Sequence, residues 1–172
     1  MDFLQLAKAR YSVRNFKPDE VEEDKLQAIL QAGRVAPTAA NLQPQRVLVV
    51  RSPQGLQKLR LGANVYGAPV ALIVCADHAS SWKRSHDGMD AAVIDATIVT
   101  DHMMMEAAAL GLGTIWVCAF NPAVIREQFQ IPEGFEPVNI LGVGYAGGQP
   151  ESPERHAQRR KPAEATIYYE EF

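Results

Sequence analysis

The stretch "DAAVIDATIVTDHMMMEAAALGLG" (residues 90–113) places the strongest constraint on the fold. A surface helix carries its apolar residues on one stripe, but here they point in almost every direction around the helix axis. A chain of 172 residues has little room to enclose such a helix. We therefore expect residues 89–110 to form a large apolar interface between two copies of the chain, and a central core helix of a monomer is the alternative. The apolar residues concerned are Val93, Ile94, Ile98, Val99, Met103, Met104, Met105 and Leu110.

Four apolar runs on either side of this helix predict β-strands, at residues 46–52, 69–77, 114–120 and 138–146. Because each run is almost unbroken, both faces of the sheet should be covered by helices. Helices are expected at 2–10, where Asp2 can cap the first turn, at 17–36, and near 54–61 and 122–129. This mixture of helices and strands indicates a single α/β or α+β domain over residues 1–172.

Composition narrows the class of protein. The formal net charge of −3 argues against nucleic-acid binding, which usually needs a basic face. No segment approaches the roughly 20 uninterrupted apolar residues of a membrane span, and the N-terminus lacks the basic start and apolar centre of a secretion signal. Cys75 and Cys118 each lie within an apolar run, so we expect two buried, reduced thiols in a cytoplasmic protein.

Positive charge gathers at two places in this acidic chain. In "ARYSVRNF" (9–16), an extended backbone would project the alternate residues Arg10, Ser12 and Arg14 to one side. A second cationic cluster lies in the tail. A common anion, most simply a phosphate, would explain both clusters, because the planar fork of arginine suits phosphate. The alternatives are that residues 9–16 form an edge strand protected by its charge and that the tail is a disordered terminus. The tail cluster in "RHAQRRKP" (155–162) comprises Arg155, Arg159, Arg160 and Lys161.

The loop "APTAANLQPQ" (36–45) offers small side chains and two carboxamides, Asn41 and Gln43. Small side chains let a flat ligand approach the backbone, and carboxamides both donate and accept hydrogen bonds. This combination suits a heterocyclic ligand, and an ordinary turn is the alternative.

Conventional catalytic and metal-binding patterns are weak. Two small groups of histidine and acidic residues have neither the ligand number nor the spacing of a metal site. Cys118 with a distant histidine is a candidate nucleophile pair, but a cysteine in an apolar strand is normally inert. The pattern therefore favours chemistry carried by a bound cofactor. The two groups are His102 with Glu106, and His86 with Asp87 and Asp90.

A series of motifs resembles the nitroreductase-like family of FMN-dependent oxidoreductases across nearly the whole chain. Each motif is weak alone, but together, in this order, they are specific for the family and not for a substrate. They are "RYSVRNF" (10–16), "APTAANLQPQ" (36–45), "GAPVALIV" (67–74), "GLGTIWVCAF" (111–120), "GVGY" (142–145) and "RRKP" (159–162).

The resemblance implies an α+β sandwich with a central, mostly antiparallel sheet, forming an intertwined homodimer with two FMN sites at the interface. The C-terminal tail, about residues 146–172, would wrap the sheet or the partner subunit. Arg10 and Ser12 would hold the FMN phosphate, with Arg159 and Arg160 closing over it, and Arg14 would lie near the flavin ring. Backbone N–H groups around Cys118 and Ala119 would lie near the flavin N5. The remaining implied cofactor-binding residues are Tyr11 and, from the other subunit, Pro37, Thr38, Ala39, Asn41 and Gln43.

The implied activity is a ping-pong transfer of hydride from NAD(P)H through FMN to a nitroaromatic, quinone or similar small acceptor. No catalytic side chain and no metal are implied, and Arg14 would tune the ring. Two other functions stay open at this point. One is a non-catalytic FMN-binding or storage protein of the same fold, and the other is a flavin-independent interaction module whose basic tail binds an acidic partner.

Overall fold

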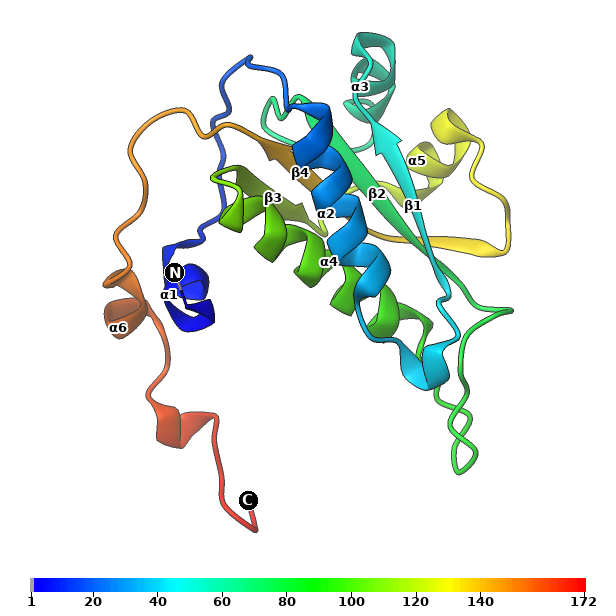
Figure 1. The fold of residues 1–172 in the computed structure, drawn as a ribbon. Coiled ribbons are helices and arrows are strands. Elements are labelled where there is room, and N and C mark those ends of the chain that lie inside the picture. Colours follow the sequence, from blue (N-terminus) through cyan, green and yellow to red (C-terminus); the bar gives the residue numbers. More distant parts are fainter. Residues whose placement is uncertain (1) are drawn as a thin grey trace.

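The computed structural model describes residues 2–172. Its centre is a four-stranded sheet in the order β1-β2-β4-β3, in which every neighbouring pair of strands is antiparallel (Figure 1). The expected α+β class and antiparallel sheet are confirmed. The strands are β1 (Gln45–Val50), β2 (Val70–Asp77), β3 (Gly113–Val117) and β4 (Phe135–Gly144).

The central strand β2 divides its side chains between two hydrophobic cores. Successive residues of a strand point to opposite faces, so one continuous apolar run can wall two layers at once. Val70, Leu72, Val74 and Ala76 belong to the core on one face, and Ala71, Ile73 and Cys75 belong to the core on the other.

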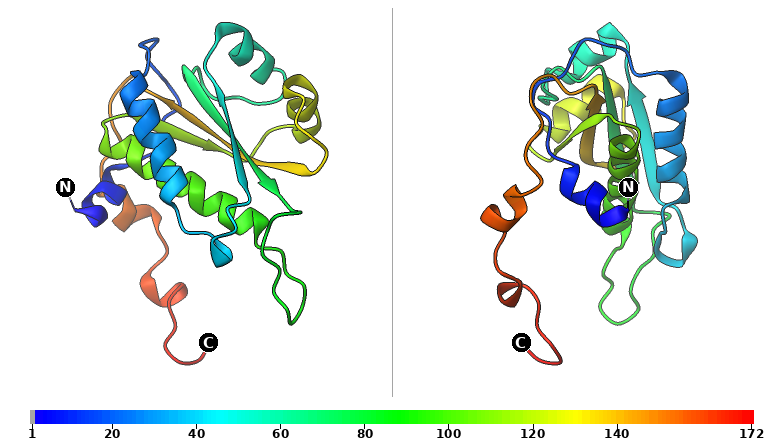
Figure 2. Two further views of the ribbon diagram at one scale, coloured as in Figure 1. Left: turned by 45° about the vertical axis from the view of Figure 1, so that its right-hand side comes forward. Right: turned by 60° about the vertical axis from the view of Figure 1, so that its left-hand side comes forward.

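Helices cover both faces of the sheet (Figures 1 and 2). α2 (Glu23–Val35) and α4 (Ala92–Ala109) pack into one core, and α3 (Pro53–Leu59) and α5 (Pro122–Phe129) pack into the other. Gly33 lets α2 approach α4 closely, because an added Cβ would lie 2.8 Å from Cγ of Met103. The remaining elements are α1 (Phe3–Ala9), α6 (Arg155–Arg159) and two 3₁₀ turns, η1 (Ala39–Asn41) and η2 (Ala163–Ala165).

α4 buries only one of its sides within the chain. The helix occupies the predicted segment, and its inner residues reach full burial. On its outer side, Val93 and Ile94 are 41% and 49% exposed. The described residues 2–172 leave these two side chains, in the first half of α4, largely uncovered. The fully buried inner residues are Ala92, Ala96, Val99, Thr100, Met103 and Ala107.

The two ends of the chain leave further apolar side chains exposed. α1 has no buried residue, and Phe3 is 70% exposed. All residues from 157 to 172 are exposed, and the tail extends away from the sheet and its helices in each view (Figure 2). Its large exposed side chains are Ile167, Tyr168, Tyr169 and Phe172.

Two expectations about the elements are wrong in detail. The helix predicted over 17–36 begins only at Glu23, because the residues before it pair with the end of β4 and its neighbours. Phe16 bridges to Ala146, and the amide of Lys17 donates to the carbonyl of Tyr145 at 2.9 Å. The expectation that helices cover both faces of the sheet also fails at β1, where Leu48 is 39% exposed.

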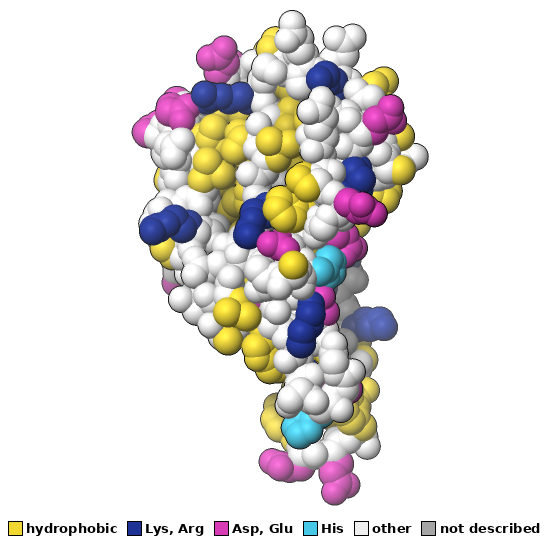
Figure 3. Space-filling model, turned by 90° about the vertical axis from the view of Figure 1, so that its right-hand side faces the viewer, with side chains coloured by type: hydrophobic (Ala, Val, Ile, Leu, Met, Phe, Trp, Pro, Cys, Tyr) yellow, Lys and Arg dark blue, Asp and Glu magenta, His cyan; other side chains and the backbone are white. Residues whose placement is uncertain are grey.

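One face of the molecule carries charge of both signs (Figure 3). On the face turned to the viewer in Figure 3, basic and acidic side chains lie scattered around exposed hydrophobic side chains. Among residues 2–172, no helix has the length and apolar character needed to cross a membrane.

Candidate functional site

The N-terminal cationic segment is held along the edge of the sheet. The amide of Val13 donates to the carbonyl of Thr114 in β3 at 2.8 Å, and Ser12 forms a parallel bridge with Thr114. Val13 is buried against Gly113, where an added Cβ would lie 2.6 Å from Cγ2 of Val13. Because Val13 points inward, its neighbours Ser12 and Arg14 project outward, as the alternation predicts.

Arg155 fastens the C-terminal tail to this segment. Its guanidinium donates to the carbonyl of Ser152 at 2.9 Å, to the carbonyl of Lys8 at 3.1 Å, and to the carbonyl of Arg10. Nε2 of His156 also lies 3.2 Å from the carbonyl oxygen of Lys8. The planar fork of Arg155 is therefore used as a structural clamp, and the side chain is only 12% exposed.

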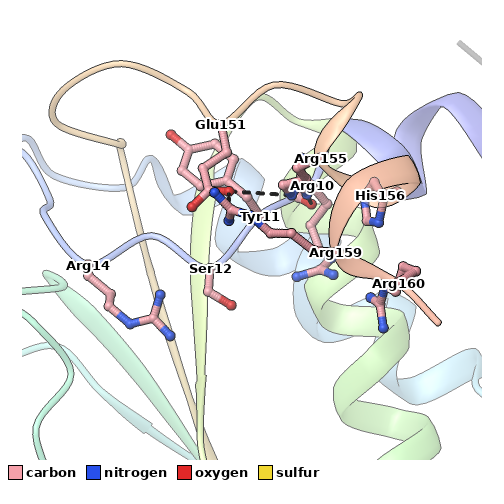
Figure 4. Close-up of a pocket in the computed structure, with 9 residues that line it drawn as sticks. All are labelled: Arg10, Tyr11, Ser12, Arg14, Glu151, Arg155, His156, Arg159 and Arg160. Carbon is pink, nitrogen blue, oxygen red and sulfur yellow. Dashed lines mark hydrogen bonds and ion pairs between the residues drawn. The ribbon is translucent and has the colours of Figure 1, made fainter.

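A hollow of about 300 Å³ lies where the N-terminal segment meets α6 (Figure 4). Burial and repulsion from the guanidinium groups of Arg155 and Arg160 hold the pKa of Arg10 below its ordinary value, and Asp101 acts in the opposite direction. This excess of positive charge favours an anionic ligand. The lining residues are Arg10, Tyr11, Ser12, Arg14, Glu151, Arg155, His156, Arg159 and Arg160.

Several donors in the hollow are unused by the described chain. Within residues 2–172, the side chains of Arg10, Ser12 and Arg160 make no hydrogen bond. In contrast, Nη1 of Arg159 donates to Oε2 of Glu151 at 2.9 Å, and Nε of Arg155 lies 3.7 Å from the same oxygen. A single carboxylate thus offsets part of the charge of the surrounding arginines. Ser12 lies between Arg14 and the arginines of the tail (Figure 4).

The predicted loop from Pro37 to Gln43 lies elsewhere in the same chain. The amide of Ala39 donates to Oδ1 of Asp95, in the first turn of α4, at 2.9 Å. The N-terminal segment and tail approach the second half of α4, near Met105. Met105 is roughly 15 Å further along the helix axis than Asp95, at about 1.5 Å per residue. One copy of the chain therefore does not bring this loop to the hollow.

The expected burial of Cys118 is wrong. β3 ends at Val117, and Cys118 and Ala119 are exposed where the chain turns to pair Phe120 with Ala63. Neither Cys118 nor Ala119 lines the hollow.

Cys75 is buried, as expected. Burial raises the pKa of its thiol to about 11. Because the thiolate is the nucleophilic form, Cys75 is inert at neutral pH.

The sequence pattern did not identify every residue of the site. Glu151 and His156 line the hollow, and Cζ of Arg14 lies 5.9 Å from the ring centroid of Tyr66. Glu151 lies before the first residue of α6, so the spacing of ion pairs along a helix does not account for its contacts with Arg155 and Arg159. Tyr66 had no signal in the sequence either, since only the fold brings it to Arg14.

In the part of the chain that the structure describes, residues 2–172, no group of three or more His, Cys, Asp or Glu residues could hold a metal.

The fold and the hollow define an α+β protein with an antiparallel sheet and a cationic hollow built from both ends of its chain. The model of the nitroreductase family matches residues 7–63 and 56–145. The chain belongs to the nitroreductase family, and the resemblance drawn from its motifs is confirmed.

Individual relatives agree with this membership. A Methanothermobacter thermautotrophicus protein, provisionally named NADH dehydrogenase/NAD(P)H nitroreductase, is 34% identical over 87% of this chain and 80% of its own. The FMN reductase (NAD(P)H) of Bacillus subtilis is 26% identical over 94% of this chain and 70% of its own. A crystal structure of a nitroreductase family protein from Clostridium difficile 630 has 48% identity, covers 100% of both chains and superimposes with a TM-score of 0.98. The likeness therefore extends through the C-terminal tail.

Proposed function

We propose that this protein is an FMN-dependent oxidoreductase that takes electrons from NAD(P)H and transfers them to a nitroaromatic, a quinone or a similar small acceptor. The observation that carries the proposal is the convergence of Arg10, Ser12, Arg159 and Arg160, from opposite ends of the chain, on one hollow. Membership of the nitroreductase family supports the reaction class. The relatives named FMN reductase and NAD(P)H nitroreductase support the cofactor and the electron donor.

The donor set of the hollow fits the phosphate end of FMN. A phosphate monoester carries close to two negative charges at neutral pH and has oxygen acceptors that match guanidinium forks and hydroxyl groups. Burial and neighbouring cations already hold the pKa of Arg10 below its ordinary value. A bound dianion would relieve this repulsion, which is why an anionic ligand suits the site better than a neutral one.

A second copy of the chain completes the site in this proposal. The outer side of α4, the unburied helix α1 and the projecting tail supply apolar surface for an interface. A two-fold axis across α4 would bring the first turn of one copy beside the second half of the other. The loop of Pro37, Thr38, Ala39, Asn41 and Gln43 would then approach the partner's hollow.

In this proposal the chain's own residues bind and orient the cofactor. When bound, FMN supplies hydride transfer between NAD(P)H and the acceptor. Arg10, Ser12, Arg159 and Arg160 hold the phosphate, and Arg14, beyond Ser12, provides positive charge at the ring end. Tyr11 and the exposed backbone at Cys118 and Ala119 are proposed as further contacts to the cofactor.

Anaerobic reduction tests this proposal. The purified, FMN-loaded protein is mixed with NADH or NADPH under nitrogen, and the visible flavin absorption is followed. We expect the band to bleach with at least one nucleotide and to return when a quinone or nitroaromatic is added. A yellow protein that neither nucleotide bleaches would indicate a non-catalytic flavin-binding protein. A colourless protein that takes up no FMN would indicate an interaction module.

A further inference from the structure

We infer that Asp95 is a positioning residue that holds the loop of residues 37–43 in the conformation in which it meets the flavin of a second copy; this inference rests on the proposed function. Asp95 lies in the first turn of α4 and is 2% exposed. Its Oδ1 accepts the hydrogen bond from the amide of Ala39 at 2.9 Å. The carboxylate thus joins the loop to the most deeply packed helix of the chain.

The loop has a backbone conformation that needs such support. Ala40, Asn41 and Gln43 have φ angles of 50°, 55° and 52°, in the left-handed region that residues with a Cβ atom rarely adopt. Conformations of this kind persist where the surroundings hold them, and they cluster at functional sites. Three such residues in a loop of seven therefore indicate that hydrogen bonds must stabilise its conformation.

Other hydrogen bonds close the loop on itself or hold its far end. Oγ1 of Thr38 accepts from the amide of Gln43 at 3.1 Å, and Nε2 of Gln43 donates to the carbonyl of Asn41 at 3.0 Å. Arg46, in β1, donates to the carbonyl of Gln43 at 3.1 Å. Asp95 is therefore the anchor at the start of the loop, and Arg46 is the anchor at its end.

Packing alone does not explain an acidic residue at position 95. Oδ2 of Asp95 is buried and has no hydrogen-bond partner among residues 2–172. Burial of an unpaired polar atom is unfavourable, so an apolar residue would be easier to accommodate. A carboxylate in the first turn of a helix interacts favourably with the helix dipole, and a charged acceptor binds the Ala39 amide more strongly than a neutral one.

The test compares Asp95→Ala and Asp95→Asn with Thr100→Val. Thr100 is a second buried polar residue of α4, and its Oγ1 bonds to Oδ1 of Asn139 and the carbonyl of Ala96, not to the loop. Hydrogen exchange of the 37–44 segment is measured in the flavin-free protein, and the Kd for FMN is measured by fluorescence quenching. The Asp95→Asn variant keeps an acceptor oxygen, so it serves if Asp95→Ala does not fold.

We expect Asp95→Ala to speed exchange of the loop amides at least tenfold and to raise the Kd for FMN at least tenfold. Asp95→Asn should lie between Asp95→Ala and the parent, and Thr100→Val should lower only the Tm. Loop exchange at the parental rate, or a loosened loop with an unchanged Kd, would overturn the inference. If the parent itself binds no FMN, the proposed function fails, and the exchange rates still decide whether Asp95 holds the loop.

Discussion

Oε2 of Glu151 lies 2.9 Å from Nη1 of Arg159, inside the hollow proposed to hold a phosphate group (Figure 4). Glu151 is the one acidic residue that lines this hollow among the described residues 2–172. Its carboxylate occupies donors that an anionic ligand needs, so the ligand and Glu151 compete for Arg159.

Glu151→Gln should therefore strengthen FMN binding. The ion pair is exposed, with side chains that are 44% and 69% accessible, and such pairs contribute about 0.2–1 kcal/mol. We expect the Kd for FMN to fall about two- to fivefold, with a smaller effect at high salt because screening weakens the competition. Titration of flavin fluorescence at two salt concentrations measures this, and weaker binding by the variant would contradict the competition.

Arg155→Lys should release the tail although it keeps the positive charge. Lysine lacks the planar fork that donates to the carbonyl groups of Lys8, Arg10 and Ser152. We expect faster proteolysis between residues 150 and 160 and a higher Kd for FMN, as in Arg155→Ala. Limited proteolysis followed by mass spectrometry measures the release. Parental resistance of Arg155→Lys would show that charge alone holds the tail.

Ile94→Asp should dissociate the proposed dimer. Ile94 is 49% exposed on the outer side of α4, and a carboxylate buried in an apolar interface is costly. We expect a largely monomeric protein in sedimentation experiments and an accompanying loss of FMN. Leu61→Asp is the matched control, because Leu61 is 65% exposed and follows α3, which packs on the other face of the sheet. An Ile94→Asp protein with the same mass in solution as the parent would place the interface elsewhere.

His78 should make stability depend on pH. Its Nδ1 lies 2.6 Å from Oδ2 of Asp90, and its Nε2 lies 2.6 Å from Oε2 of Glu136. Since carboxylates only accept, the doubly protonated ring satisfies both contacts, and these hydrogen bonds raise the pKa of His78 above its ordinary value of 6.5. The folded state thus gains stability from His78 below the unfolded pKa and loses this gain as pH rises through the higher folded pKa.

The corresponding measurement is the urea midpoint of the parent and of His78→Gln between about pH 5.5 and about pH 9. We expect the difference between them to be largest at the acidic end and to shrink as pH rises above 6.5. His86→Gln is the control, because His86 is exposed in the same connection between β2 and α4. A difference that grows with pH would contradict the assigned contacts.

The sequence was sufficient for the positions of the strands and of α4, because each is a long apolar run. It was not sufficient for their ends. Val117 is the last residue of β3 that pairs with β4, opposite Ile140. The chain then leaves the sheet, and Cys118 is exposed. The start of α2 was misplaced because Lys17 is held by the backbone of Tyr145, a partner far along the chain.

The candidate site was predictable where local alternation decides it. Ser12 and Arg14 project as expected because Val13 is buried between them, and Arg10 lines the same hollow. Other roles depend on distant partners that no local pattern reveals. Arg155 binds backbone carbonyl groups near the N-terminus, and an acidic residue within an apolar helix gives no sign of its bond to a loop 56 residues away.

The central claim is that the hollow recognises the phosphate group, and the Kd values for FMN and riboflavin test it most directly because riboflavin lacks the phosphate. Each charged hydrogen bond contributes about 1.5–3 kcal/mol, so we expect the parent to prefer FMN by at least about 100-fold. The double variant Arg10→Ala/Arg160→Ala should bind the two flavins almost equally, while Arg60→Ala, at an exposed position outside the hollow, should keep the full preference. A parent that binds FMN and riboflavin equally well, or a double variant that still prefers FMN as strongly as the parent, would contradict the account.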